Sequence, residues 1–149
     1  MGFFSLLQFI ANHPLNRPER ARAITRFFRW QLATRMMRVP MAIPFVEGTC
    51  LLATKGMTGA TGNWYCGLHE PHDMGFVLHL LRPDDLFLDV GANIGSYTVL
   101  AAGAVGANVI ALEPVDAAFL TLESNIALNR LAGRVSAYQM GASDHVGTL

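Results

Sequence analysis

Residues 86–96 read Leu-Phe-Leu-Asp-Val-Gly-Ala-Asn-Ile-Gly-Ser, and this stretch decides the fold. Its first five residues form a short, mostly apolar run that ends at Gly91, which is typical of a buried parallel strand. Residues 96–104 then predict a helix. A glycine-containing turn between a buried strand and a helix is a common binding loop, because backbone N–H groups at the helix start can approach a ligand. The sequence therefore predicts a strand–loop–helix unit with a binding site in its loop.

The residues that follow repeat the alternation of strand and helix. Residues 109–112 predict a second strand, residues 116–131 a helix with Asp116 as its cap, and residues 135–140 a third strand. This order favours an α/β fold with a doubly wound, mostly parallel sheet. We expect residues 85–149 to form the start of a Rossmann-like domain.

The composition of the chain excludes several classes of protein. Of its 149 residues, 52% are apolar and 15% are charged, which is incompatible with a disordered chain. Its two cysteines make no disulfide framework, so a cytoplasmic protein is expected. The apolar opening has no basic leader or cleavage site and falls short of the ~20 residues that span a bilayer. A net charge of zero gives no reason to expect nucleic acid as a partner.

Charge is unevenly divided along the chain. Residues 1–55 carry eight basic and two acidic side chains, a net +6, whereas residues 56–149 carry three basic and nine acidic ones, a net −6. Most of the positive charge belongs to an extension, residues 1–44, in which residues 19–38 predict a basic amphipathic helix. Its expected apolar face is made by Ile24, Phe27, Phe28, Leu32 and Met36. The arginines opposite are either solvated or in contact with an anionic membrane or lipid-linked substrate.

Residues 45–84 predict a part that covers the binding site. Strands are expected at 45–47 and 49–54, split at Gly48. Four glycines between residues 55 and 67 predict a loop whose aromatic residues, Trp64 and Tyr65, could cover a ligand. A helix is expected to begin at Pro71 and end before Arg82-Pro83.

The residue types around the loop at 89–96 indicate the kind of ligand. Glu113 lies 22 residues after Gly91, at the end of the next strand, where an acid can accept hydrogen bonds from both ribose hydroxyls of an adenosine-type cofactor. A dinucleotide site would have glycine at position 93, but Asn93 stands there and would obstruct a pyrophosphate. Asp89 would repel phosphate but suits a cation. The loop therefore fits S-adenosylmethionine better than NAD, and the remaining alternative is a tight turn with an incidental acid.

The loop and Glu113-Pro114 resemble class I S-adenosylmethionine-dependent methyltransferases, and more specifically the FkbM family. The resemblance rests on residues 56–70 and 80–98, with Ala142-Ser143-Asp144 and Gly147 adding to it. It covers residues 45–149. It implies a Rossmann-like, seven-stranded fold of which this chain supplies three core strands, so that it would be an N-terminal fragment, incomplete at its C-terminus. The general base would then lie beyond residue 149, and no catalytic residue is assigned.

The resemblance also implies a reaction and a set of cofactor-binding residues. The reaction is O-methylation of a hydroxyl on a sugar, lipid-linked glycan or polyketide-type acceptor. The cofactor would be S-adenosyl-L-methionine. Its methionine side would lie on the loop, Glu113 would bind the ribose, and the remaining pair would lie near the adenine. The expected cofactor-binding residues are Asp89, Gly91, Asn93, Gly95, Ser96, Glu113, Ser143 and Asp144.

Two rival functions remain open at this point. One is an NAD(P)-binding Rossmann oxidoreductase, which Asn93 disfavours. The other is a non-catalytic fragment that associates with membranes through residues 1–38. A metal site at His69, Glu70 and His72 is not expected, because their spacing does not match the common zinc-binding motif.

Overall fold

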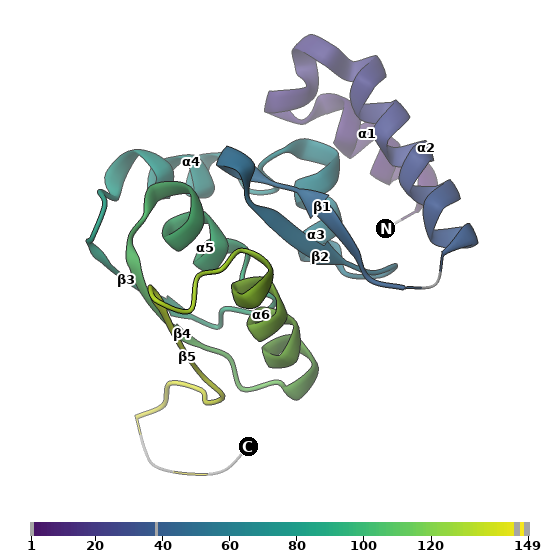
Figure 1. The fold of residues 1–149 in the computed structure, drawn as a ribbon. Coiled ribbons are helices and arrows are strands. Elements are labelled where there is room, and N and C mark those ends of the chain that lie inside the picture. The colour runs from purple at the N-terminus through teal and green to yellow at the C-terminus, as the bar shows by residue number, and fades with distance from the viewer. Residues whose placement is uncertain (1, 38, 145–146, 148–149) are drawn as a thin grey trace.

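The computed structural model describes residues 2–37, 39–144 and 147, and it has an α/β architecture (Figure 1). Its first half is mainly helical and contains a two-stranded hairpin. Its second half alternates strands with helices. The elements of the first half are α1 (Phe3–Asn12), η1 (Pro14–Glu19), α2 (Arg20–Met36), β1 (Met41–Pro44), η2 (Val46–Gly48), β2 (Cys50–Ala53), α3 (Thr58–Cys66) and α4 (Pro71–Leu80). Those of the second half are β3 (Leu86–Val90), α5 (Ser96–Val99), η3 (Leu100–Val105), β4 (Asn108–Leu112), α6 (Asp116–Leu128) and β5 (Val135–Tyr138).

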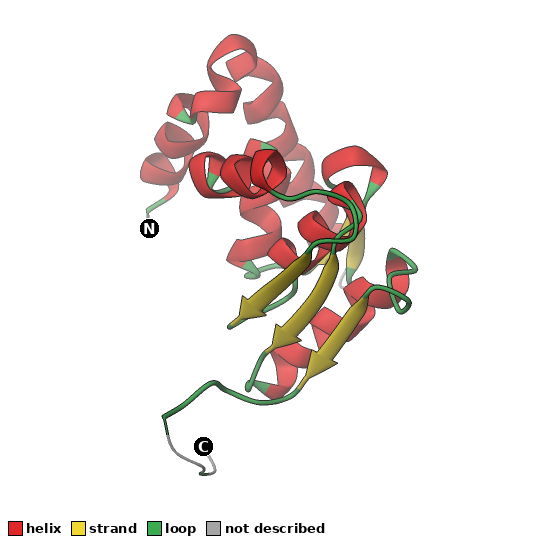
Figure 2. Ribbon diagram, turned by 90° about the vertical axis from the view of Figure 1, so that its left-hand side faces the viewer, coloured by secondary structure: helices red, strands yellow, loops and turns green. Residues whose placement is uncertain are grey.

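The predicted parallel sheet is confirmed. Strands β3, β4 and β5 pair in sequence order and in parallel, with Asp89 opposite Ala111 and Ala111 opposite Ala137 (Figure 2). Right-handed crossovers are the rule for such units, and they place the connecting helices against a sheet face. The helix predicted over residues 96–104 is present, but it changes from an α-helix to a π-helix at Leu100. The prediction that residues 86–90 form a buried strand is wrong for one face, because Leu86, Leu88 and Val90 of this edge strand are exposed.

Two asparagines, one in α6 and one directly after it, connect the hairpin to the second half of the chain. Asn125 of α6 accepts a hydrogen bond from the backbone N–H of Leu52 at 2.7 Å. Asn129, one turn later, accepts from the N–H of Cys50 at 2.8 Å and donates to its carbonyl oxygen at 2.8 Å. Strand β1 pairs with only one edge of β2. The two asparagine side chains satisfy backbone N–H and C=O groups on its other edge. Asn125 also donates to the carbonyl of Ile94 in the predicted binding loop, at 2.7 Å.

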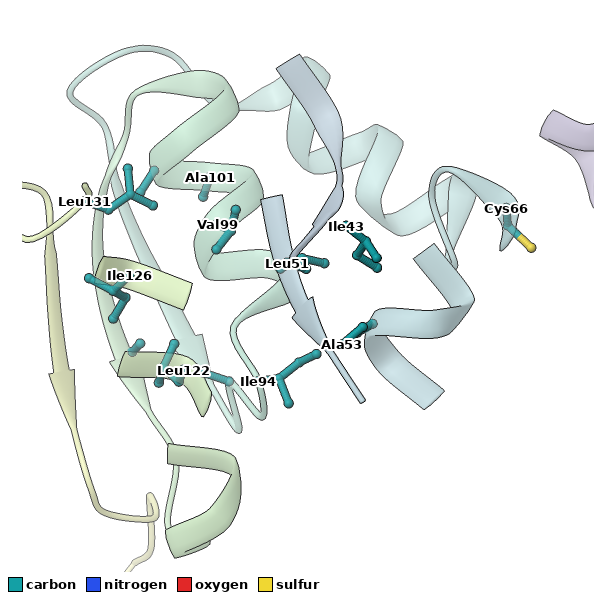
Figure 3. Close-up of a cluster of buried hydrophobic side chains, with 14 of the residues drawn as sticks. Ile43, Leu51, Ala53, Cys66, Ile94, Val99, Ala101, Leu122, Ile126 and Leu131 are labelled. Atoms are coloured by element: carbon teal, nitrogen blue, oxygen red, sulfur yellow. The ribbon is translucent and has the colours of Figure 1, made fainter. Parts of the chain in front are cut away.

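The main core lies between the hairpin and the helices of the second half. Figure 3 shows Ile43 and Leu51 of the hairpin in one cluster of buried side chains with residues of α5, η3 and α6. The buried residues labelled there include Ile43, Leu51, Ala53, Ile94, Val99, Ala101, Leu122, Ile126 and Leu131. The hairpin is thus packed as part of the same core as the binding loop. Of the two strands expected in this region, the second is confirmed, but residues 45–47 are not a strand, because Val46–Gly48 form a short helical turn.

The prediction of a loop over residues 55–67 is wrong, because Thr58–Cys66 form the helix α3. The glycines in it permit close packing. A Cβ on Gly62 would lie 2.4 Å from Nδ1 of His69, and one on Gly59 would already touch Ile94 at 3.7 Å. Tyr65 does not cover a ligand site; its buried ring lies 5.4 Å, centroid to centroid, from that of Phe27. Close approach of α3 to its neighbours offsets the low helix propensity of glycine.

The basic helix is present as α2, but only Ile24 and Phe27 of its predicted apolar face pack on the core. The buried residues of α2 recur at helical spacing and are Ala23, Phe27, Trp30 and Thr34. Phe28, Leu32 and Met36 are exposed. Only Phe27 is shared by the two sets, so α2 is apolar on two sides. The longest helices of the described residues are still too short or too polar to cross a bilayer.

Candidate functional site

The loop after β3 is held in shape by its backbone. Three of its residues have positive φ: Gly91 (79°), Asn93 (51°) and Gly95 (87°). The N–H groups of Gly91 and Ala92 both donate to the carbonyl of Leu112, at 2.9 and 3.0 Å, and so tie the loop to the end of β4. Left-handed backbone is unfavourable for most residues, but glycine and asparagine tolerate it.

The two glycines have different surroundings. A Cβ on Gly95 would lie 2.5 Å from Cδ1 of Leu122, so the close packing of the loop on α6 requires glycine there. A Cβ on Gly91 would meet nothing within 4 Å. Gly91 therefore borders open space while its backbone is held in the left-handed region. This is the arrangement expected where a ligand approaches the main chain.

Glu113 joins the loop to the end of the neighbouring strand. It is only 5% exposed. One carboxylate oxygen accepts from the N–H of Asn93 at 2.7 Å and the other from the N–H of Val115 at 2.9 Å. A carboxylate has about four lone-pair sites, so both oxygens can each accept one further hydrogen bond. The structure thus brings Glu113, Asn93 and Gly91 together, as the sequence predicts, and adds a contact through the backbone of Asn93 that the sequence analysis did not include.

Asp89 is the second buried acid at this edge of the sheet. It is 8% exposed, and the hydroxyl of Thr98 donates to its carboxylate at 2.5 Å. Burial raises the pKa of Asp89, the hydrogen bonds from Thr98 oppose the rise, and the nearby charge of Glu113 adds to it. Two acids therefore lie close together, and among the described residues neither forms a salt bridge. Such a region favours a cationic ligand.

An Asp89→Asn variant should be more stable than the parent protein at neutral pH. Because the pKa of Asp89 is raised on folding, its ionised form opposes folding, and this penalty is fully present above the folded pKa. The gain in melting temperature should shrink as the pH falls toward 3.8, the ordinary pKa of the group. Thermal denaturation of both proteins from pH 4 to pH 8 measures this. Asp73→Asn, which removes an exposed acid, is the control, and an equal gain in both variants would contradict the explanation.

Asn63 of α3 supports the loop from the other side and was missed by the sequence analysis. It is buried, and its amide donates to the Gly59 carbonyl at 2.9 Å and to the Ser96 hydroxyl at 3.3 Å. Its carbonyl oxygen accepts from the N–H of His69 at 2.8 Å. Asn63 therefore connects three segments, and it places Ser96 at the start of α5. Its neighbours in sequence predict a loop, so no local signal indicated this role.

Glu70 and Tyr97 form a second polar contact beside the loop. The Tyr97 hydroxyl donates to the Glu70 carboxylate at 2.9 Å. Burial and this hydrogen bond raise the pKa of Tyr97, and the charges of Asp73 and Asp89 add to the rise. The pKa of Tyr97 therefore depends on the charge of Asp89, an acid of the predicted site. Among the described residues, no group of three or more His, Cys, Asp or Glu side chains is placed to bind a metal ion.

Ser143 and Asp144 lie in the exposed segment after β5. The Ser143 hydroxyl donates to the Asp144 carboxylate at 3.4 Å. Their assignment to the adenine side of the site remains a prediction.

Comparison with known proteins supports the resemblance inferred from the sequence. The chain is 43% identical over 68 residues to the 31-O-demethyl-FK506 methyltransferase FkbM of Streptomyces tacrolimicus. This match covers 45% of this chain and 25% of that protein. It is 42% identical over 66 residues to the AMB antimetabolite synthetase AmbE of Pseudomonas aeruginosa, covering 44% of this chain and 3% of that protein. The chain thus spans a quarter or less of the curated relatives it matches. No family model matches it.

Solved structures settle the fold. Pyrococcus horikoshii TYW2, in complex with MeSAdo, superposes with a TM-score of 0.57 at 24% identity, over 74% of this chain and 39% of that one. The Pyrococcus abyssi tRNA (uracil-54, C5)-methyltransferase, in complex with S-adenosyl-L-homocysteine, superposes with a TM-score of 0.52 at 15% identity, over 70% of this chain and 24% of that one. The fold is that of a class I methyltransferase. The described part of the chain contains three parallel strands of this class I methyltransferase fold, with the glycine loop at the carboxyl end of β3.

Proposed function

We propose that the protein binds S-adenosyl-L-methionine in the loop after β3 and serves an S-adenosylmethionine-dependent methyl transfer. The observation that carries the proposal is the position of Glu113. Its buried carboxylate lies at the end of β4, bonded to the loop at Asn93, and each of its oxygens has a lone pair left. Ligands of open α/β sheets bind outside the carboxyl ends of the strands. An adenosine ribose beside Glu113 would supply the hydroxyl donors that these lone pairs can accept.

The residues present fit this cofactor. Gly91 borders open space, which leaves room for a ligand against the backbone. Asp89 and Glu113 give the region negative charge, which suits the ammonium and sulfonium groups of S-adenosylmethionine and opposes the pyrophosphate of NAD. In the proposed site, Asp89, Gly91, Asn93, Gly95 and Ser96 surround the methionine side. Ser143 and Asp144 would lie on the adenine side of the proposed site.

The proposed reaction is methylation of a hydroxyl on a sugar, glycan or polyketide-type acceptor. When bound, the cofactor supplies a methyl group on a positively charged sulfur: the acceptor oxygen bonds to the methyl carbon as the carbon–sulfur bond breaks, and the hydroxyl proton is released. The named residues of this chain orient the cofactor, and positioning of this kind contributes most of the rate in such displacements. The name of FkbM, which specifies an O-demethyl compound, supports oxygen as the atom that is methylated. Another protein of the same fold is a tRNA methyltransferase, so a nucleic-acid acceptor is the second candidate.

Isothermal titration calorimetry tests the choice of cofactor. We expect the chain to bind S-adenosylhomocysteine and to show no heat of binding with NADH. The physical reason is that Asn93 and the two acids oppose a pyrophosphate, whereas Glu113 can bind the ribose of either molecule. Tighter binding of NADH would support the oxidoreductase alternative and would overturn the proposal.

A further inference from the structure

The surface formed by α1 and α2 carries an apolar ridge that the proposed function does not use. We define the ridge by five side chains: Phe3, Phe4, Phe28, Leu32 and Met36. All five are more than half exposed; Phe4 reaches 82% and Met36 77%. Isolated exposed apolar residues are normal on a protein surface, but a contiguous set marks a contact site. In Figure 1 these two helices lie at the end of the molecule away from the three-stranded sheet.

Ring contacts through Phe27 connect the part of the ridge on α1 with the part on α2. The rings of Phe4 and Phe3 lie 5.6 Å apart, those of Phe3 and Phe27 5.9 Å, and those of Phe27 and Phe28 5.4 Å, all measured between centroids. Phe27 is the buried link in this series. From Phe28 the ridge continues along α2 in steps of four residues through Leu32 to Met36. A step of four residues keeps side chains on one face of a helix.

Positive charge flanks the ridge. At 100° per residue, Arg29 and Arg35 lie on either side of the line from Phe28 to Met36, and both side chains are exposed. Residues 2–37 carry six arginines and one glutamate, a net +5. A second copy of this chain would bring the same positive charge against itself, so the charge favours an anionic partner.

A basic pocket continues this surface where α2 ends. It has a volume of about 440 Å³ and is lined by Thr34, Arg35, Met37, Val39, Thr54 and Lys55. The cationic side chains of Arg35 and Lys55 and the hydroxyl of Thr54 supply donors that match a phosphate oxygen. Met37 and Val39 are exposed apolar residues at the rim of the pocket. Arg35 and Met37, which line the pocket, are the neighbours in the sequence of Met36, the last residue of the ridge.

We infer that α1 and α2 form a surface for peripheral binding to an anionic lipid membrane. The ridge would enter the boundary between headgroups and acyl chains, Arg29 and Arg35 would contact anionic headgroups, and the pocket would take a lipid phosphate. This combination of exposed aromatic and aliphatic residues with flanking arginines is the usual composition of helices that lie in a membrane interface. The inference is independent of the proposed methyl transfer.

Vesicle flotation of the whole chain tests the inference. We expect binding to vesicles of phosphatidylcholine with 30% phosphatidylglycerol and little binding to phosphatidylcholine alone. Arg29→Gln with Arg35→Gln should weaken binding roughly 25-fold, from about five-fold per arginine. Phe4→Ser with Phe28→Ser should weaken it at least ten-fold. All four side chains are exposed, so circular dichroism should show folded variants.

Matched controls separate this surface from general stickiness. Leu120→Ser removes an exposed leucine from α6, and Arg130→Gln removes an arginine from the acidic half; both should bind as the parent does. Equal binding to neutral and anionic vesicles, or unchanged binding of both the double arginine variant and the double phenylalanine variant, would overturn the inference. So would absence of vesicle binding together with a dimer, seen by sedimentation, that Phe4→Ser with Phe28→Ser abolishes, because a second copy would then cover the ridge.

Discussion

A Gly91→Val variant should lose binding of S-adenosylhomocysteine while keeping its secondary structure. Gly91 has a φ of 79°, a conformation that a β-branched side chain adopts only with strain. Its added side chain would also project into the open space that borders the loop. Because no protein atom lies within 4 Å of the new Cβ, the variant should fold, and the loss should appear in calorimetry rather than in circular dichroism.

Gly48→Val is the matched control for this prediction. Gly48 has a φ of 80° and also has nothing within 4 Å of its Cβ, but it lies in the turn between β1 and β2. Backbone strain is therefore the same in the two variants and only the position differs. If Gly48→Val lost binding to the same extent, or if Gly91→Val bound normally, the loop would be a turn with no ligand.

A Glu113→Ala variant should weaken binding of S-adenosylhomocysteine roughly 10–150-fold. A hydrogen bond to a charged group contributes ~1.5–3 kcal/mol, which corresponds to this range. The variant also leaves the N–H groups of Asn93 and Val115 without their acceptor, so the loop would lose its attachment to the end of β4. Calorimetry gives the change in affinity.

Two further variants separate the roles of Glu113. Glu113→Gln keeps the shape but exchanges one acceptor oxygen for an amide that donates, so it should show an intermediate loss. Glu123→Ala removes an exposed acid from α6 and should bind as the parent does. Unchanged affinity of Glu113→Ala for S-adenosylhomocysteine would show that the Glu113 carboxylate does not bind the cofactor.

The strand, the loop and the acid could be predicted from sequence because their signals are local. A short apolar run ending in glycine defines β3, and the spacing to Glu113 follows from one strand–helix–strand unit. The structure ties Gly91 to the end of β4 through a backbone hydrogen bond to Leu112, and it joins Asn93 to Glu113 through the carboxylate of Glu113.

The helix α3 could not be predicted because its stability depends on distant contacts. Glycine has a low helix propensity, and four glycines in thirteen residues favour a loop by local rules. The space above Gly62 is filled by the ring of His69, and this packing is visible only in three dimensions. The support that Asn63 gives to Ser96 was missed for the same reason.

The periodicity of apolar residues also could not predict which face of α2 packs on the core. Ala23, Phe27, Trp30 and Thr34 form one face at helical spacing, and Phe28, Leu32 and Met36 form another. Periodicity detects an apolar face but does not choose between two of them. Likewise, Asn125 and Asn129 bond to backbone groups 73 and 79 residues away, which no local pattern indicates.

The central claim is that the loop of residues 89–96 and Glu113 form the binding site for S-adenosylmethionine. Titration of the ¹⁵N-labelled chain with S-adenosylhomocysteine, followed by two-dimensional ¹H–¹⁵N NMR, tests it residue by residue. We expect the amide signals of Gly91, Asn93, Gly95 and Glu113 to shift together and to saturate, while those of α1 and α2 stay in place. Saturable shifts confined to residues outside the loop, or no shifts at millimolar ligand, would contradict the account.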